Sequence, residues 1–109
     1  MRTAKIYRTM AGDEPYVDFL KSLGDPIGAA QIVARVRRIE LGGNLGDHKQ
    51  LGDGVFELRM HASAGYRVYF GRQGETVIVL LSASAKGDQN RAIKKAKQYW
   101  LDYLARKEH

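Results

Sequence analysis

Five polar side chains in the middle of this 109-residue chain have the chemistry to act on a phosphate group. They are Glu57, Arg59, His61, Arg67 and Tyr69. Arginine stays charged and offers paired hydrogen-bond donors to phosphate oxygens, whereas a carboxylate or an imidazole can take up a proton. Because this combination is difficult to explain by folding alone, it predicts a site for a phosphate-bearing partner.

Such side chains supply the groups that RNA cleavage needs when no metal ion or other cofactor takes part. The ribose 2′-hydroxyl attacks the neighbouring phosphate, so the reaction needs a base, positive charge around the phosphorane oxygens, and an acid for the leaving oxygen. Arg59 and Arg67 are candidates for the positive charge. Glu57 or His61 is a candidate base. Tyr69 can stack on a nucleobase or donate a proton.

Each of these residues also has a simpler structural interpretation. Glu57 and Arg67 can form a cross-strand ion pair on a solvated face of the sheet. His61 can be a strand-end residue without a ligand, and Tyr69 can be a packing residue. Both kinds of interpretation depend on where the side chains lie in the fold.

Three short strands, predicted at 55–61, 66–71 and 76–84, must position these side chains. The connections are the tight turns 62–65 and 72–74. In the first two strands the alternate positions are apolar, so both apolar sets must enter the core together. The polar sets then share the other face. The third strand reads V-I-V-L-L at 77–81, which indicates a strand covered on both sides.

The remaining segments predict one strand and three helices. We expect a strand at 3–9, helices at about 15–23, 26–41 and 88–107, and a Gly-rich loop at 42–54 that lacks the pattern of a phosphate-binding P-loop. The order is β-α-α-β-β-β-α. It predicts an α+β fold in one domain, residues 1–109, with an antiparallel sheet and helices packed mainly on one side.

The composition is that of a soluble globular protein, with 44% hydrophobic and 28% charged residues. The chain has no cysteine, which excludes disulfides and thiolate metal sites. No signal peptide and no membrane-spanning apolar run is evident, so we expect a cytoplasmic protein with no membrane partner. The net charge of +6 favours a polyanionic partner, either nucleic acid or an acidic protein.

Several segments of the chain together resemble one family. They are L-G-D-G-V-F-E-L-R at 51–59, G-Y-R-V-Y-F at 65–70, and K-x-x-Q at 86–89 before an A-I-x-x-A helix at 92–96. In this order and spacing they look like the RelE/ParE toxin superfamily, and most of all like its phage Gp49-like, HigB-type branch of addiction module killer proteins. The resemblance covers nearly the whole chain.

The resemblance implies the toxin of a type II toxin–antitoxin pair, neutralised by a cognate antitoxin. Many members of the superfamily are endoribonucleases that cut mRNA on the ribosome without a metal ion. Position by position, Arg67 matches the arginine of the family's G-Y-R segment, and Arg59 matches the basic residue of the preceding strand. Lys86 matches the basic residue after the last strand.

The chain departs from the ribosome-dependent relatives at three places. Glu57 stands where many of them carry a lysine, and Gly87 and Asp88 follow Lys86 in place of a further arginine. Near the end of the chain, no tyrosine or histidine matches the terminal catalytic residues of some relatives. A second hypothesis therefore stays open, in which the protein inhibits DNA gyrase by binding, as ParE-like members do, without cleaving RNA. A third is a phage-derived accessory protein that has lost its activity.

Overall fold

A computed structural model describes residues 1–61 and 65–106 of the chain. The described elements, in chain order, are β1 (Thr3–Ile6), α1 (Pro15–Ser22), α2 (Pro26–Glu40), β2 (His48–Gly52), β3 (Val55–Arg59), β4 (Arg67–Gln73), β5 (Val77–Ser84), a 3-10 turn (Lys86–Asp88) and α3 (Gln89–Arg106). This mixed arrangement confirms the predicted α+β class and is compatible with a RelE-like fold. The predicted turn residues 62–64 and the predicted helix end at 107 lie outside the described residues.

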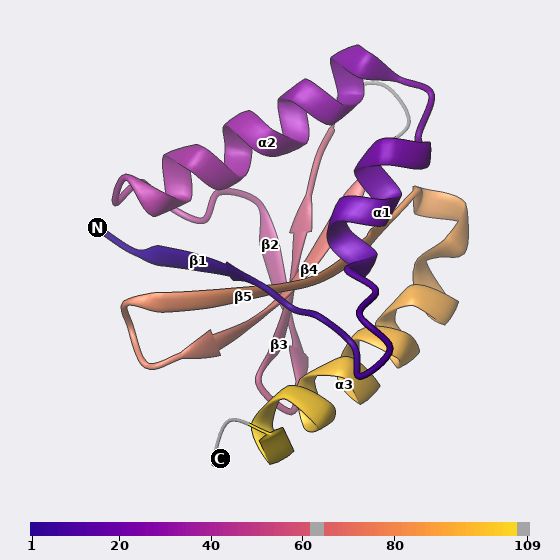
Figure 1. Cartoon of the computed structure of the whole chain (residues 1–109). Helices are drawn as coiled ribbons and strands as arrows, with labels where there is room; N and C mark the ends of the chain where they lie inside the picture. The colour runs from indigo at the N-terminus through magenta and orange to yellow at the C-terminus, as the bar shows by residue number, and fades with distance from the viewer. Residues whose placement is uncertain (62–64, 107–109) are drawn as a thin grey trace.

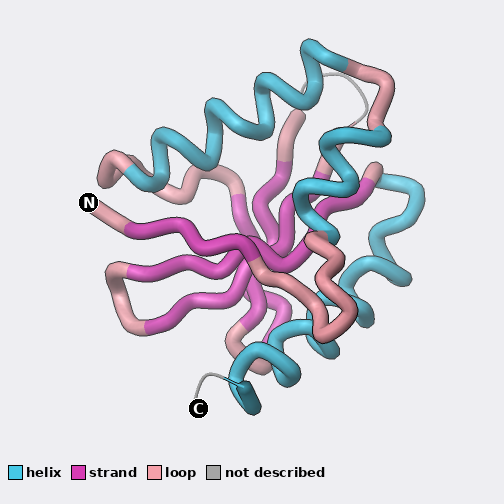
Figure 2. Tube along the Cα trace, in the orientation of Figure 1, coloured by secondary structure: helices cyan, strands magenta, loops and turns pink. Residues whose placement is uncertain are grey.

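The described strands form one sheet in the order β1-β5-β4-β3-β2. Strands β2 to β5 are antiparallel neighbours, as expected from their short connections. Strand β1 is different, because it pairs with β5 in parallel. Figure 2 shows the strands fanning across the centre of the molecule with helices on either side.

Strand β2 lies in the segment 42–54, and the prediction of a loop throughout that segment is wrong. The chain turns at Asp53 and Gly54, which have φ of 58° and 84°, and enters β3 as a hairpin. Asp-Gly is a strong hairpin signal because both positions of such a turn need positive φ. The strand itself gives little signal, since most of its side chains are exposed and polar.

One face of the sheet packs against α1 and α2 (Figure 1). Buried there with Ile32 and Ile39 of α2 are the side chains that alternation predicted to face the helices: Leu58, Met60, Tyr66, Val68 and Phe70, with Phe56 partly buried beside them. This confirms the predicted parity of β3 and β4. The N-terminus of α2 is fastened to the same face, because Asp25 accepts hydrogen bonds from the Gly28 amide at 2.9 Å and from the Tyr66 hydroxyl at 2.6 Å.

The opposite face packs against α3. Its buried cluster comprises Tyr7, Val55, Tyr69, Val79, Leu81, Ala96 and Trp100. The expectation that the helices lie mainly on one side therefore holds for α1 and α2 but is wrong for α3. The physical reason is the apolar stripe of α3, which needs an apolar surface of its own.

Strand β5 is covered on both sides, as its unbroken apolar run predicted. Ile78 and Leu80 lie in the cluster under α1 and α2, whereas Val79 and Leu81 lie in the cluster under α3. A bulge then shifts the register, so that Phe70 pairs with Leu80 but Tyr69 pairs with Ser82. Beyond this bulge, the polar positions of β4 and β5 are cross-strand neighbours. None of the described helices has the length and apolar character needed to cross a membrane.

Candidate functional site

The ladder between β3 and β4 brings the predicted polar side chains together in two rows. Glu57 pairs with Tyr69, and Arg59 pairs with Arg67. We call Glu57 and Tyr69 the inner row and Arg59 and Arg67 the outer row. The register confirms that the polar sets of the two strands share a face. The face is not open, however, because α3 covers the inner row.

Glu57 is fully buried, with 0% of its surface exposed, and both of its oxygens have partners. Oε1 accepts a hydrogen bond from Nε of Arg59 at 3.1 Å, and Oε2 accepts one from Nε2 of Gln89 at 2.6 Å. The ion pair of Glu57 is therefore with Arg59 on its own strand, and the expectation of a Glu57–Arg67 pair is wrong. A buried carboxylate is tolerated only with such partners.

Tyr69 is also fully buried. Its hydroxyl lies 3.0 Å from Oγ of Ser84, which in turn donates to the Ala85 carbonyl at 3.0 Å. Burial raises the pKa of Tyr69; the hydrogen bond with Ser84 and the charge of Arg67 oppose the rise, and the charge of Glu57 adds to it. In this geometry the ring of Tyr69 packs under α3 and has no exposed face on which a nucleobase can stack.

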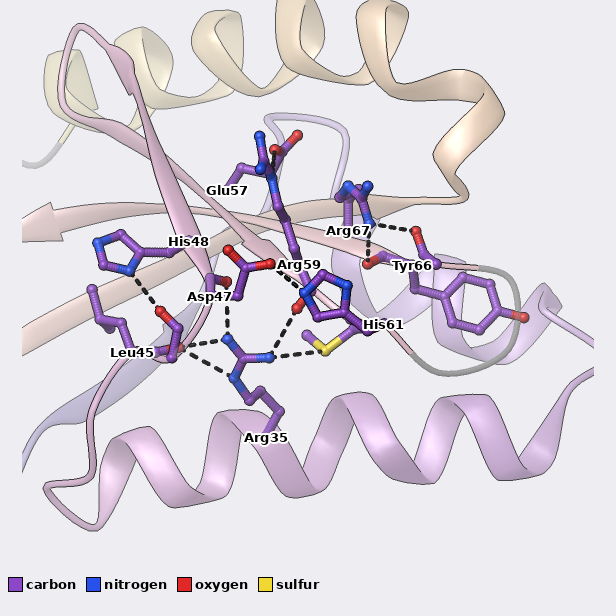
Figure 3. Close-up of polar contacts among 12 residues, drawn as sticks. Arg35, Leu45, Asp47, His48, Glu57, Arg59, His61, Tyr66 and Arg67 are labelled. Carbon is purple, nitrogen blue, oxygen red and sulfur yellow. Dashed lines mark hydrogen bonds and ion pairs between the residues drawn. The ribbon is translucent and has the colours of Figure 1, made fainter.

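Arg67 is the first residue of β4, at the end of the sheet, and only 8% of it is exposed. Its Nη1 donates to the carbonyls of Gly65, at 2.8 Å, and Tyr66, at 3.4 Å (Figure 3). Its Nε is buried without a hydrogen-bond partner, and none of the described carboxylates forms an ion pair with it. A buried guanidinium whose charge is not balanced by an acid attracts an anion.

Lys86 and Arg59 stand on either side of Arg67. A side chain built on Gly65 would place its first atom 3.7 Å from Nη1 of Arg67 and 3.7 Å from the Lys86 side chain, so both flank the same space. Arg59 keeps 31% of its side chain exposed while Glu57 holds its Nε. In the described part of the chain, nothing bonds its two terminal nitrogens. Three cationic side chains thus converge at one end of the sheet.

His61 lies outside this convergence. It follows the end of β3, with 76% of its side chain exposed, and its Nε2 contacts Oδ2 of Asp47. Figure 3 shows the pair lying between Arg35 of α2 and the outer row. Of the predicted site residues, the structure therefore gathers Arg59, Arg67 and Lys86 at an accessible edge. It buries the other two strand residues and sets His61 apart with a new partner.

Three contributing residues were not predicted from the sequence. Gln89 was part of the K-x-x-Q segment, which gave it no role, and it now holds Glu57. Asp47 lies in the segment that was predicted to be a loop, directly before β2. The Asp-Gly hairpin signal at 53–54 was the clue that a strand precedes that turn. Arg35 falls off the apolar stripe of α2, so its position gave no sign of a buried partner, but it donates to the Leu45, Asp47 and Arg59 carbonyls.

Comparison with known proteins gives two findings. The family profile described as phage derived protein Gp49-like matches residues 18–100 of the chain. A protein of Haemophilus influenzae, described as "Uncharacterized protein", is 38% identical over 95 residues, which cover 87% of this chain and 91% of that relative. The profile match confirms the Gp49-like part of the resemblance that the sequence motifs indicated. The chain therefore belongs to the Gp49-like family of phage-derived, toxin-like proteins.

Proposed function

We propose that this protein is the toxin of a type II toxin–antitoxin system and cleaves mRNA on the ribosome without a metal ion. The observation that carries the proposal is the buried guanidinium of Arg67, which has no carboxylate partner among the described residues and is flanked by Lys86 and the partly exposed Arg59. Such a cradle of fixed donors suits a phosphodiester whose charge increases in the transition state. Membership of a toxin-like family and the net charge of +6 are consistent with it.

The proposed reaction is an internal transfer at one phosphate. The 2′-hydroxyl gives its proton to His61, its oxygen forms a bond to phosphorus, and the bond from phosphorus to the 5′-oxygen breaks. The ammonium of Lys86 gives the leaving 5′-oxygen a proton, and solvent restores both side chains. The products are a 2′,3′-cyclic phosphate and a free 5′-hydroxyl.

Glu57 and Tyr69 have supporting parts in this proposal. Glu57 has no exposed surface and both of its oxygens are occupied, so it orients the guanidinium of Arg59 and leaves the role of base to His61. Tyr69 has a raised pKa and a hydroxyl bonded to Ser84, so it supports the sheet and gives up no proton. Exposure favours His61 over Glu57 as the base, because a base must reach the substrate.

The experiment is primer extension on a translated transcript after the protein is induced in a bacterial host. Wild type should produce new 5′ ends within the message. Arg67→Ala should lower the cleavage rate by about 10²–10³-fold, because it removes a donor to the developing charge. Arg37→Ala is the matched control, since Arg37 is an exposed arginine of α2 whose carboxylate partner is Glu40.

Two results would reject the enzyme reading. Growth arrest with intact transcripts would favour the binding hypothesis, and a supercoiling assay with purified DNA gyrase would then be the direct test. Normal growth after strong expression of folded wild-type protein would favour an inactive accessory protein. Full toxicity of Arg67→Ala would remove that residue from the proposed site.

The proposal includes a cognate antitoxin as a second partner. The support is the toxin-like family and a basic surface that suits an acidic protein. We expect a small DNA-binding protein, encoded beside this chain, to co-purify with it and to restore growth when co-expressed. Failure of every neighbouring gene product to do either would reject the antitoxin part of the proposal.

A further inference from the structure

Asp47 and His61 form a dyad that lies against the outer row. The amide of Arg59 donates to the Asp47 carbonyl at 3.0 Å, which places Asp47 across from Arg59. The amide of Met60 donates to the Tyr66 carbonyl at 2.9 Å, so the β3–β4 ladder continues past the end of the strand. His61 is the next residue along that ladder. The dyad therefore lies beside Arg59 of the outer row, in a hollow that it shares with Arg35 and Arg38 of α2.

The backbone that carries Asp47 is fixed by Arg35. This half-buried guanidinium donates to the Leu45 carbonyl at 2.6 Å, to the Asp47 carbonyl at 3.0 Å and to the Arg59 carbonyl at 3.0 Å. Gly46 lets the loop approach so closely: its φ is 73°, and a side chain there would lie 2.7 Å from Nη2 of Arg35. The loop before β2 and the end of β3 are thus tied to one helix. The backbone position from which the Asp47 carboxylate reaches His61 is therefore fixed by the fold.

The contact determines which nitrogen of His61 carries the proton. A carboxylate can only accept hydrogen bonds, so Nε2 of His61 must donate to Oδ2 of Asp47. In the neutral ring the lone pair is then on Nδ1. Nothing in the described part of the chain bonds Nδ1, and the side chain is largely exposed. The free lone pair is therefore accessible to a ligand.

We propose that Asp47 is a positioning residue that holds His61 in the Nε2–H form, so that Nδ1 is the base that takes the 2′-hydroxyl proton. This inference rests on the proposed function, and adds to it a residue and a tautomer. The charged groups that face His61 are Asp47 itself and Arg35 and Arg38 of α2, which line the same hollow. The arginines favour the approach of a polyanionic substrate to this ring.

The test combines nuclear magnetic resonance with a cleavage assay. Long-range ¹H–¹⁵N correlation spectra identify the protonated nitrogen of a neutral imidazole, and His61→Ala assigns the signals. Wild type should show the Nε2–H form. Asp47→Ala should release the ring to a mixture of both forms and lower cleavage of a reporter message in a cell-free translation extract about tenfold or more.

Conservative and control variants separate positioning from folding. Asp47→Glu keeps a carboxylate, which can only accept from Nε2–H, so it should retain the wild-type tautomer and most of the cleavage. Asp13→Ala removes an exposed carboxylate in the loop before α1 and should change neither readout. The double variant Asp47→Ala with His61→Ala should cleave no more slowly than His61→Ala alone, because Asp47 acts only through the ring.

The outcomes distinguish this inference from the proposed function. Wild-type cleavage that is unchanged in Asp47→Ala, with or without a change of tautomer, would overturn the role of Asp47 and leave the proposed function standing. Equal loss in Asp47→Glu and Asp47→Ala would also overturn it, since the loss would then not depend on the acceptor carboxylate. If wild type cuts no message, the proposed function fails and the catalytic role of the dyad fails with it.

Discussion

The inner and outer rows lie on the same face of the same two strands, yet they differ in how their polar atoms are satisfied. In the inner row, Glu57 and Tyr69 are sealed under α3 and their polar atoms have protein partners. In the outer row, Nε of Arg67 is buried without a partner and Arg59 is partly exposed. Satisfied buried groups stabilise a fold, whereas unsatisfied ones are available to a ligand. Two residues along a strand thus separate a structural polar cluster from a candidate binding site.

The largest expected effect on stability comes from breaking the inner row. Glu57→Ala removes the acceptor for Arg59 and Gln89 and leaves a cavity under α3, so the free energy of unfolding should fall by about 3 kcal/mol. Denaturation in urea measures it. Glu57→Gln keeps the shape of the side chain and one acceptor oxygen, so it should lower the free energy of unfolding by less. A loss for Glu57→Ala of under about 1 kcal/mol, the size typical of an average substitution, would mean that the inner row is not a stabilising cluster.

The next largest effect on stability is expected from displacing α3, the helix that covers the inner row. Gly71 lies directly under Trp100 of α3, and a side chain at Gly71 would come within 2.3 Å of the indole ring. Gly71→Ala should therefore push α3 away and cost about 2 kcal/mol, as overpacking usually does. Gly87→Ala is the matched control, because nothing lies within 4 Å of its added atom. Equal stability of the two variants would contradict close packing of α3 on the sheet.

The difference between the two rows was beyond what the sequence could predict, although the rows themselves were predicted. Alternation of apolar residues in β3 and β4 assigns Glu57 and Arg59 to one face, and the register confirms it. Alternation does not say what covers that face. The cover comes from the stripe of α3 and from Gly71, and the contact between them joins residues far apart in the chain.

The dyad was beyond sequence prediction for a different reason. His61 was identified by its residue type, but its partner Asp47 lies in a polar segment that has no apolar alternation. The placement of Asp47 depends on Arg35, a side chain that lies off the apolar stripe of its helix. Residue types therefore identified the candidate cations Arg59, Arg67 and Lys86, while long-range hydrogen bonds decide which side chains can act on a substrate.

A smaller effect is expected at a buried polar contact on the other face of the sheet. The Tyr66 hydroxyl and then the Gly28 amide lower the pKa of Asp25 by hydrogen bonding. A carboxyl with a lowered pKa in the folded state contributes stability above its unfolded pKa and loses it as the pH falls through the folded pKa. Asp25→Asn should therefore reduce stability at neutral pH and flatten its decline in acid. Parallel curves of unfolding free energy against pH for the two proteins would contradict the pKa shift.

The smallest effect on stability should accompany a large effect on activity, at His61. Its side chain is mostly exposed and contacts only Asp47 among the described residues, so His61→Ala should change the free energy of unfolding by less than about 0.5 kcal/mol. Cleavage should nevertheless fall by about 10²-fold if the ring is the base. Glu57→Ala should show the reverse, with loss of stability first and loss of cleavage through misplacement of Arg59. If instead both variants lose stability and cleavage in the same proportion, the residues at the sheet end act through folding alone, and the distinction between a structural inner row and a candidate site in the outer row would have to be abandoned.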